Sequence, residues 1–327
     1  MSGDTGAKRI GVREVAAAAG VSTQTVSRVL NGYPGIRDVT RERVLDAVAA
    51  LDYRVNNAAR ALGTSQTRTV GVVASDAVLH GPSAGIAALE RAARGRGRWI
   101  STAYTDSDDP ADIDAAVRHL LDQGVDGIVL VAAHGATSLE GYDVPLVPLY
   151  GESGSRQRAA AALVVDHLVD LGHRRIVEVA GPADWREARA RTRGVADALH
   201  RRGVERDGCV EGDWSAASGS AIAGAVADLV RAGATAVAVA NDQMALGLVA
   251  GLVERGLAVP GDVSVAGFDD NPDAAFYTPA LTTVRLDVEG EAAEAVATVL
   301  GEVAEPPADP VLVPRASTAA PRGAAPR

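Results

Sequence analysis

Apolar residues recur at the spacing of one helix face in three segments near the start of the chain. The first segment ends at Gly20, which accepts the positive φ of a tight turn. The second follows Ser22, whose hydroxyl can cap a helix, and the third runs from Asp38 to Leu51. The apolar stripes are Val12, Val15, Ala16 and Ala19; Val26, Val29 and Leu30; and Val44, Leu45, Val48 and Leu51. Three short helices with a tight turn between the first two predict a helix-turn-helix domain.

From residue 69 onward the pattern changes to short β-rich runs separated by helical runs of ten to twenty residues. This alternation predicts βαβ units and parallel sheets flanked by helices. There are too many strands for one compact sheet, so we expect two similar α/β lobes. The strands are predicted at Val70–Ala74, Trp99–Tyr104, Gly127–Val131, Leu146–Tyr150, Arg175–Ala180, Ala236–Ala240 and Val263–Phe268.

The second helical segment carries a polar face opposite its apolar stripe. Thr23, Gln24, Ser27 and Arg28 fall at i, i+1, i+4 and i+5. Hydrogen-bonding side chains on one short helix face suit a recognition helix in a DNA major groove. An ordinary amphipathic hairpin is the alternative for this stretch alone. Asn31 and Arg41 lie where they can hold phosphates, although a helix C-cap and a solvated charge explain them nearly as well.

Composition narrows the class of protein. Hydrophobic residues make up 47% of the 327 residues and aromatic residues only 3%, so the core is built from Ala, Val and Leu. The single cysteine excludes an internal disulfide and a Cys-rich zinc site. No apolar run approaches a membrane span and the first ten residues are too polar for a secretory signal, so we expect a cytoplasmic protein. The six histidines lack metal-ligand spacing and no catalytic motif stands out, which predicts neither an enzyme, a metal nor a cofactor.

Charge is divided unevenly along the chain. The net charge is -10, yet residues 1–65 contain nine basic and six acidic residues and carry +3, which leaves -13 for the rest. This asymmetry predicts a basic nucleic-acid-binding module joined to an acidic domain with another task.

The first sixty residues resemble the lactose-repressor family of bacterial transcriptional regulators. The resemblance lies in VREVAAAAGVSTQTVSRVLNG, TRERV, LDYR and AARAL. It implies a hinge helix near residues 57–62 that folds when a dimer binds its operator, with Leu62 wedged into the minor groove. Packing of Leu62 on the domain behind it is the alternative. Two departures are Gly11 at the first cap and Arg37-Asp38 before the third helix, where Asp38 can still act as a cap. The expected DNA-binding residues are Ser22, Thr23, Gln24, Ser27, Arg28, Asn31, Asn57 and Leu62.

Polar and aromatic residues follow several predicted strands, where ligands bind in parallel α/β sheets. Hydroxyls of a sugar are bound by guanidinium, amide and carboxylate groups, while an aromatic face covers the C–H side of the ring. Each residue also has a simpler explanation, namely an ion pair, a helix cap, a loop hydrogen bond or core packing. The set that points to a sugar is Arg191, Trp214, Asn241 and Asp269.

The family resemblance continues through LHGPS, EGDWSAASG, ANDQMALG, GFDD and YTPALTTV, to about Val313. It implies that Arg191, Asn241 and Asp269 bond sugar hydroxyls and that Trp214 packs on the ring. It also implies that the opposite lobe lines the pocket with Ser75, Leu79 and Pro82. The departures are Tyr150 in place of an aspartate, a shortened segment 151–167, and Leu286 and Val288 in place of a glutamine and a phenylalanine. The tail after Val313 has no heptads, which predicts a homodimer without a tetramerising coiled coil.

We therefore expect a helix-turn-helix domain at 1–54, a hinge helix and linker at 55–68, and a two-lobed, periplasmic-binding-protein-like domain for sugar binding and dimerisation at 69–327. The predicted function is a repressor that a galactoside-like inducer releases from double-stranded operator DNA. A co-repressor acting on the same fold is the first alternative, because sequence does not reveal the sign of the coupling. A sugar-binding transport receptor is the second, against which the basic N-terminal module and the missing signal peptide count.

Overall fold

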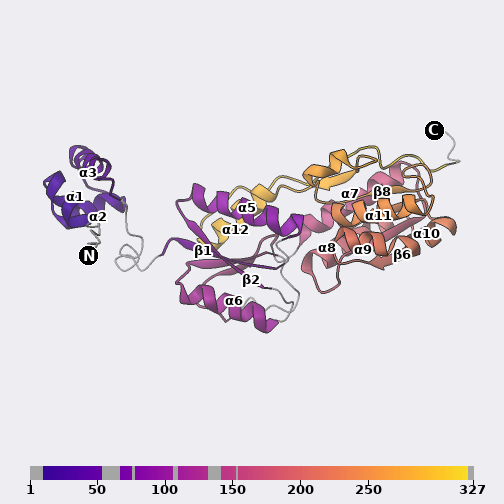
Figure 1. Cartoon of the computed structure of the whole chain (residues 1–327), viewed down its shortest axis with the longest axis horizontal. Helices are drawn as coiled ribbons and strands as arrows, with labels where there is room; N and C mark the ends of the chain where they lie inside the picture. Colours follow the sequence, from indigo (N-terminus) through magenta and orange to yellow (C-terminus); the bar gives the residue numbers. More distant parts are fainter. Residues whose placement is uncertain are drawn as a thin grey trace, which may run out of the picture. The chain divides into compact units, whose positions relative to one another are not determined.

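The computed structural model describes residues 10–53, 67–75, 78–105, 110–131, 141–151 and 154–322. The chain separates into two compact units, Met1–Thr67 and Arg68–Arg327 (Figure 1). Within the part of the chain that is described, no helix is long and apolar enough to cross a membrane.

The first unit contains α1 (Val12–Ala19), α2 (Thr23–Leu30) and α3 (Asp38–Ala50), as the apolar stripes predict, although Leu45 of the third stripe is exposed to solvent. Their buried faces meet in a small core of Val15, Ala16, Ala19, Val26, Val29, Val44 and Ala47. Gly20 ends α1 with φ +61°, the left-handed turn that brings α2 against it. At the first cap, Glu14 Oε2 accepts the Gly11 amide at 3.0 Å. The prediction that Asp38 caps α3 is wrong: Arg37 is the N-cap residue, without a side-chain cap bond, and Asp38 lies inside the first turn.

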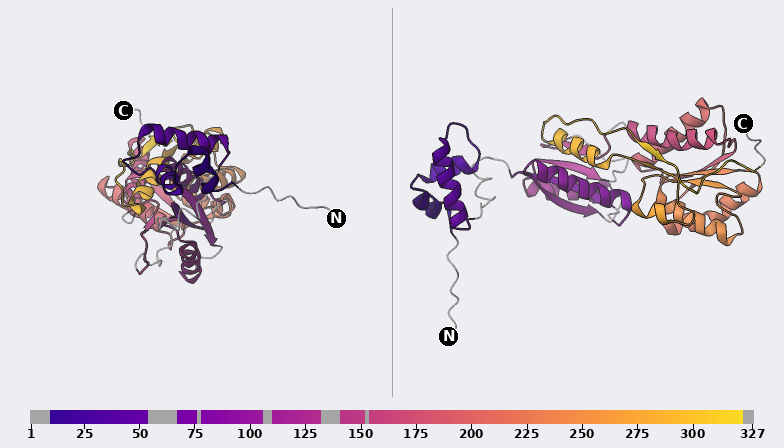
Figure 2. Two further views of the ribbon diagram at one scale, coloured as in Figure 1. Left: turned by 90° about the vertical axis from the view of Figure 1, so that its left-hand side faces the viewer. Right: turned by 90° about the horizontal axis from the view of Figure 1, so that it is seen from above.

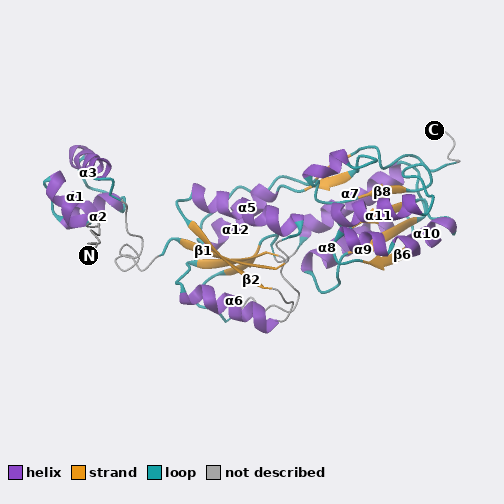
Figure 3. Ribbon diagram, in the orientation of Figure 1, coloured by secondary structure: helices purple, strands orange, loops and turns teal. Residues whose placement is uncertain are grey.

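The second unit begins with a lobe built on a four-stranded sheet in the order β2-β1-β3-β4 (Figure 3). All three strand pairs are parallel, as the alternating pattern predicts. Helices α5 and α12 cover one face of the sheet and α6 covers the other (Figure 1). The elements of this lobe are β1 (Thr69–Ser75), α5 (His80–Gly95), β2 (Trp99–Thr105), α6 (Pro110–Asp122), β3 (Gly127–Val131), β4 (Leu146–Pro148) and α12 (Val288–Val299).

The other lobe repeats the architecture with the parallel order β6-β5-β7-β8. Its sheet packs against α7 and α8 on one face and against α10 and α11 on the other. The elements of this lobe are α7 (Ser155–Asp170), β5 (Ile176–Ala180), α8 (Arg186–Arg201), β6 (Arg206–Glu211), α9 (Ala216–Ala221), α10 (Ala223–Arg231), β7 (Ala236–Val239), α11 (Asp242–Glu254), β8 (Ser264–Ala266) and the 3-10 helix η1 (Pro272–Phe276).

Two short strands join the lobes. The chain leaves the second lobe through β9 (Thr283–Arg285), forms α12 in the first lobe, and returns through β10 (Val311–Val313). These connecting strands pair antiparallel, with Val284 opposite Leu312. Both residues pack into the core beneath α7. Figure 2 shows the strands passing between the lobes in the view from above.

The structure differs from the predicted strands mainly at their ends and in three additional strands. The predicted strand Leu146–Tyr150 stops at Pro148, and Val263–Phe268 shortens to Ser264–Ala266. The additional strands are β6, β9 and β10. The edge strand β6 is rich in charge and has no buried residue, and β9 is only three residues long, so neither contains a long apolar run.

Candidate DNA-contact face and ligand pocket

The polar face of α2 is open to solvent. Ser22 caps the helix, its Oγ accepting the Thr25 amide at 3.1 Å. Val26 and Val29 are buried against α1 and α3, so the opposite face of the helix is turned outward. The exposed residues on it are the predicted contacts Thr23, Gln24, Ser27 and Arg28. One helix therefore presents two hydroxyls, an amide and a guanidinium within six residues, the donor and acceptor set that reads base edges.

Two further predicted contacts extend this face. Asn31 is the C-cap residue of α2 and donates from Nδ2 to Ser27 Oγ at 3.3 Å. The Arg28 guanidinium lies 6.0 Å from the centre of the Tyr33 ring, where it remains exposed. Arg41 donates to the Tyr33 carbonyl at 3.5 Å and stays on the same surface. The predicted contacts Asn57 and Leu62 lie outside the described residues.

A pocket lies between the lobes of the second unit and is lined by residues of both lobes. The second lobe contributes most of its polar groups. The residues that line it are Leu79, Gly81, Pro82, Val131, Tyr150, Trp185, Glu187, Arg191, Trp214, Asn241 and Asp269. Six of the seven predicted ligand contacts are therefore brought together. The exception is Ser75, which ends β1 and is buried but is not part of the lining.

Arg191 is the central cation of the pocket. It projects from α8 and is only 7% exposed. Its guanidinium donates to Gln157 Oε1 at 2.8 Å, to the Ala240 carbonyl, and to Asp269 Oδ1 at 3.1 Å. It also stacks 3.8 Å from the centre of the Phe268 ring. A guanidinium clamped on several sides is fixed before a ligand arrives, so little entropy is lost when its outer edge binds a hydroxyl.

Asp269 lies three residues after the end of β8 and is hydrogen-bonded to Arg191. Burial raises the pKa of its carboxyl, while the charge of Arg191 and the hydrogen bond from it lower the pKa. Tyr150 lies near this pair, and burial raises the pKa of its hydroxyl above the ordinary value. This wall of the pocket therefore offers a carboxylate acceptor, a guanidinium donor and a phenol that stays protonated.

Asn241 and Trp214 are locked to each other. Asn241 caps α11, accepting the Met244 amide on Oδ1 at 2.8 Å, and donates from Nδ2 to the Trp214 carbonyl at 2.9 Å. Trp214 adopts a left-handed φ of +75° and packs its ring over Gly181, where an added Cβ would lie 2.2 Å from the indole. The cap and packing alternatives are thus both present, and both residues line the pocket as well.

Gly81, Val131, Trp185 and Glu187 also line the pocket without being among the predicted contacts, and the last two add an aromatic ring and a carboxylate. Trp185, the N-cap residue of α8, forms an edge-to-face pair with Trp214, the ring centres 5.5 Å apart. Glu187 lies one turn before Arg191 on the same helix, and this i, i+4 spacing is the signal that could have placed it on the pocket side. Tyr150, Trp185 and Trp214 thus place three aromatic rings in one site of a chain that has few aromatic residues.

The lobes also meet directly beside the pocket. Gln243 at the start of α11 accepts the amide of His80 at the start of α5, with a separation of 3.0 Å. Of the departures near the last connection, Leu286 packs in the core of the second lobe and Val288 packs against the cores of both lobes; neither lines the pocket. Among the described residues, no cluster of three or more His, Cys, Asp or Glu side chains has the arrangement of a metal site.

Comparisons with known proteins agree with this architecture. The model of the bacterial regulatory proteins of the lacI family matches residues 12–56, and that of a periplasmic binding protein-like domain matches residues 165–323. The lactose operon repressor of Escherichia coli is 35% identical over 294 residues, which cover 86% of this chain and 81% of the repressor. This chain belongs to the lacI family.

Solved structures of this family match most of the chain. The lac repressor dimer bound to operator and an anti-inducer matches with a TM-score of 0.76 and 32% identity, covering 96% of this chain and all of that one. A complex of the transcriptional regulator CelR with cellobiose matches with a TM-score of 0.67 and 30% identity, covering 94% of this chain and all of that one. The relatives are named regulators and repressors and not enzymes. The lacI-family chain described here is thus a DNA-binding transcriptional regulator.

Proposed function

We propose that this regulator is a homodimeric repressor that leaves its operator when a sugar binds between the lobes of the second unit. The observation that carries the proposal is the pocket itself. Arg191, Asp269 and Asn241 present a guanidinium, a carboxylate and an amide beside the Trp214 ring. Such a set matches the alternating hydroxyl edge and C–H face of a pyranose.

DNA binding is assigned to α2 of the first unit. Thr23, Gln24 and Arg28 would read base edges, while Ser22, Ser27 and Asn31 would support the helix or reach phosphates. The hinge function of Asn57 and Leu62, and the domain bounds 1–54, 55–68 and 69–327, belong to this proposal through the family resemblance. A dimer presents two such helices to a pseudo-palindromic site.

The ligand acts by preferring one arrangement of the lobes. A ligand can shift the equilibrium only by its difference in affinity for the two arrangements. Leu79 and Pro82 approach from the first lobe, whereas Arg191, Trp214 and Asn241 belong to the second. A sugar held by both sides therefore has contacts that depend on the angle between the lobes, which is the requirement for induction.

A galactoside is the first candidate for the sugar because a lactose operon repressor is among the relatives of this chain, at 35% identity. A β-linked glucose disaccharide is the second candidate. The CelR structure holds cellobiose, and Tyr150 and Trp185 add aromatic surface next to Trp214 on which a second ring can stack.

Operator-release titration tests the proposal. DNA selected from a random library by the full-length protein would serve as operator, and binding would be followed by fluorescence anisotropy with a panel of mono- and disaccharides. An inducing sugar lowers operator affinity, and a co-repressing sugar raises it. The proposal is wrong if no member of the panel binds the protein or changes its affinity for the operator.

A further inference from the structure

Two consecutive aspartates after β8 have unusual backbone conformations. Asp269 has φ +103° and Asp270 has φ +49°, both in the region that favours glycine. Side chains with a Cβ pay conformational free energy there, and such residues persist only where the surroundings hold them. The cause of the strain therefore has to be found among their neighbours.

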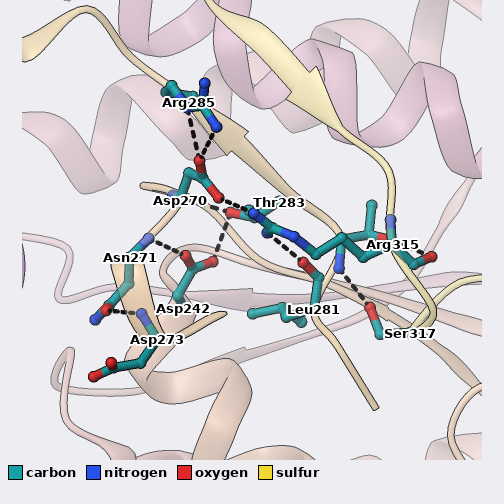
Figure 4. Close-up of polar contacts among 10 residues, drawn as sticks. Asp242, Asp270, Asn271, Asp273, Leu281, Thr283, Arg285, Arg315 and Ser317 are labelled. Atoms are coloured by element: carbon teal, nitrogen blue, oxygen red, sulfur yellow. Dashed lines mark hydrogen bonds and ion pairs between the residues drawn. The ribbon is translucent and has the colours of Figure 1, made fainter. Parts of the chain in front are cut away.

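Asp270 is held by two arginines (Figure 4). Its Oδ1 accepts Arg315 Nη2 at 2.6 Å, and its Oδ2 accepts Arg285 Nε at 2.7 Å. Its side chain is 7% exposed. These two guanidinium groups lower the pKa of Asp270 although burial opposes them, so the carboxylate stays ionised.

The two arginines belong to the segments that connect the lobes. Arg285 ends β9, and Arg315 follows β10 on the returning segment. Arg315 also donates to the Leu281 carbonyl at 2.8 Å, which ties the returning segment to the chain just before β9. Asp270 thus joins the outgoing and returning connections at one point.

Backbone contacts carry this anchoring to Asp269. The Asp269 amide donates to the Val284 carbonyl of β9 at 2.9 Å, and the Asp270 amide donates to Thr283 Oγ1 at 3.3 Å. Thr283 in turn donates to the buried Asp242 at 2.6 Å, and the second carboxylate oxygen of Asp242 accepts the Asn271 amide at 2.7 Å. The loop is therefore fastened on both sides of the strained pair.

We propose that Asp270 is a positioning residue of the pocket: its ion pairs with Arg315 and Arg285 hold Asp269 in the left-handed conformation that points its carboxylate at Arg191 and attach this wall of the pocket to both connecting strands. Calling the pocket an effector site rests on the proposed function, whereas the anchoring of Asp269 does not. Arg315 is 17% exposed and Arg285 61% exposed, so water screens the second pair more and Arg315 contributes the larger share.

The first test needs no ligand. Hydrogen exchange would be measured on the full-length protein with Asp270→Asn, and with Asp273→Asn as the matched control on the same loop, where the side chain is exposed. The amide of Asp269 should exchange at least tenfold faster in Asp270→Asn, while the core strands β5 and β7 keep their protection. Arg315→Gln should reproduce most of this change and Arg285→Gln little of it.

Unchanged protection of the Asp269 amide in Asp270→Asn would overturn the proposal. So would a loss of protection spread evenly over the whole lobe, since that is the result of a general loss of stability.

The second test uses cellobiose and methyl β-galactoside as probes of the pocket, with Trp fluorescence as the signal. For whichever probe binds, Asp270→Asn should lower its affinity about tenfold, and Asp273→Asn should not. In a background of Asp269→Asn, adding Asp270→Asn should change affinity less than twofold, because Asp270 acts through Asp269.

Additive losses of affinity would show that Asp270 acts independently of Asp269 and would reject the positioning role. If neither sugar binds the wild-type protein, it is the assignment of these sugars to the pocket that fails, and the exchange experiment still decides the role of Asp270.

Discussion

The face of α2 and the pocket between the lobes are both polar, yet they are built in opposite ways. The candidate contacts on α2 come from one helix, lie within six residues and are exposed to water. The pocket residues come from segments as far apart as Leu79 and Asp269, and the buried Arg191 is bonded to Gln157 and to the half-buried Asp269. A surface of the first kind adapts to its partner, whereas a site of the second kind is fixed before its partner arrives.

This difference has an energetic consequence. Removing a side chain from an exposed face leaves its neighbours hydrated, so the losses are moderate and nearly independent. Removing one from the pocket leaves a buried partner without its bond, which costs more and couples the residues. The following experiments test this contrast, beginning with the largest expected effect.

Arg191→Lys should lower affinity for the effector sugar about a hundredfold. A lysine keeps the charge but lacks the planar fork that reaches Gln157 and Asp269 together. The loss of two charge-assisted hydrogen bonds from the guanidinium to the sugar hydroxyls, at about 1.5 kcal/mol each, amounts to roughly 3 kcal/mol of binding free energy. Each 1.4 kcal/mol or so corresponds to about a tenfold change in affinity. Titration with the sugar that releases the operator would measure the loss.

Arg189→Lys is the matched control for this variant. Arg189 lies on the same helix but is directed to the carbonyls of Ala183 and Asp184 at its exposed start. It should leave sugar affinity unchanged. Equal affinity of Arg191→Lys and wild type for the sugar would remove Arg191 from the ligand contacts.

Arg28→Ala should weaken operator binding by about 1–3 kcal/mol, because a bidentate arginine contact to a base edge contributes that much discrimination. Binding to random DNA should fall much less. Arg28→Lys should also lose most of the preference for operator over random DNA, because a lysine has the charge but not the planar guanidinium that makes two hydrogen bonds to a guanine. Anisotropy titrations with operator and scrambled DNA would separate the two terms.

Arg41→Ala provides the comparison for Arg28, because we expect it to hold a phosphate. It should weaken operator and random DNA alike. The same uniform loss in Arg28→Ala would identify Arg28 as a phosphate contact.

Asp242→Asn should flatten the dependence of stability on pH. Burial, together with the nearby charge of Asp269, raises the pKa of Asp242 to about 8. The folded protein therefore keeps a proton that the unfolded chain releases near pH 4. The contribution of this bound proton to the free energy of unfolding is complete below about pH 4. It is lost as the pH rises through about 8, at up to about 1.4 kcal/mol per pH unit.

Urea unfolding between pH 5 and 9 would measure this term as the difference between wild type and Asp242→Asn. Asp273→Asn, which alters an exposed carboxyl nearby, should follow the wild-type curve. Parallel curves for wild type and Asp242→Asn would contradict the assignment of the term to Asp242.

Ser22→Ala should have the smallest effect, a loss of about 1 kcal/mol confined to the first unit. The substitution removes the acceptor of the Thr25 amide at the start of α2. Hydrogen exchange of amides in α2 in the full-length protein would report it, with Thr23→Ala as the control for a lost exposed hydroxyl. A loss of protection in the second unit would contradict a purely local cap.

The sequence by itself determined what depends on neighbours along the chain. The three helices of the first unit follow from the spacing of Val15, Val26 and Val44, and the exposed face of α2 is the complement of its buried stripe. The parallel sheets follow from the alternation of apolar runs and helices, since a parallel pair needs a long crossover. The position of Arg191, Trp214, Asn241 and Asp269 after predicted strands pointed to a sugar site, and the family resemblance assigned each residue its role.

Only the tertiary structure decided what depends on residues distant in sequence. Helical spacing places Glu187 on the same face of α8 as Arg191, but only the fold shows that Trp185 and Glu187 line the pocket. The ends of β4 and β8, and the existence of β9 and β10, depend on which partners pair with them. The anchoring of Asp270 requires two arginines that follow it by 15 and 45 positions. An ionised carboxylate that is buried without opposite charges beside it raises the free energy of the folded state, so Asp270 needs both arginines. Their distance from Asp270 along the chain gives no sign of this pairing.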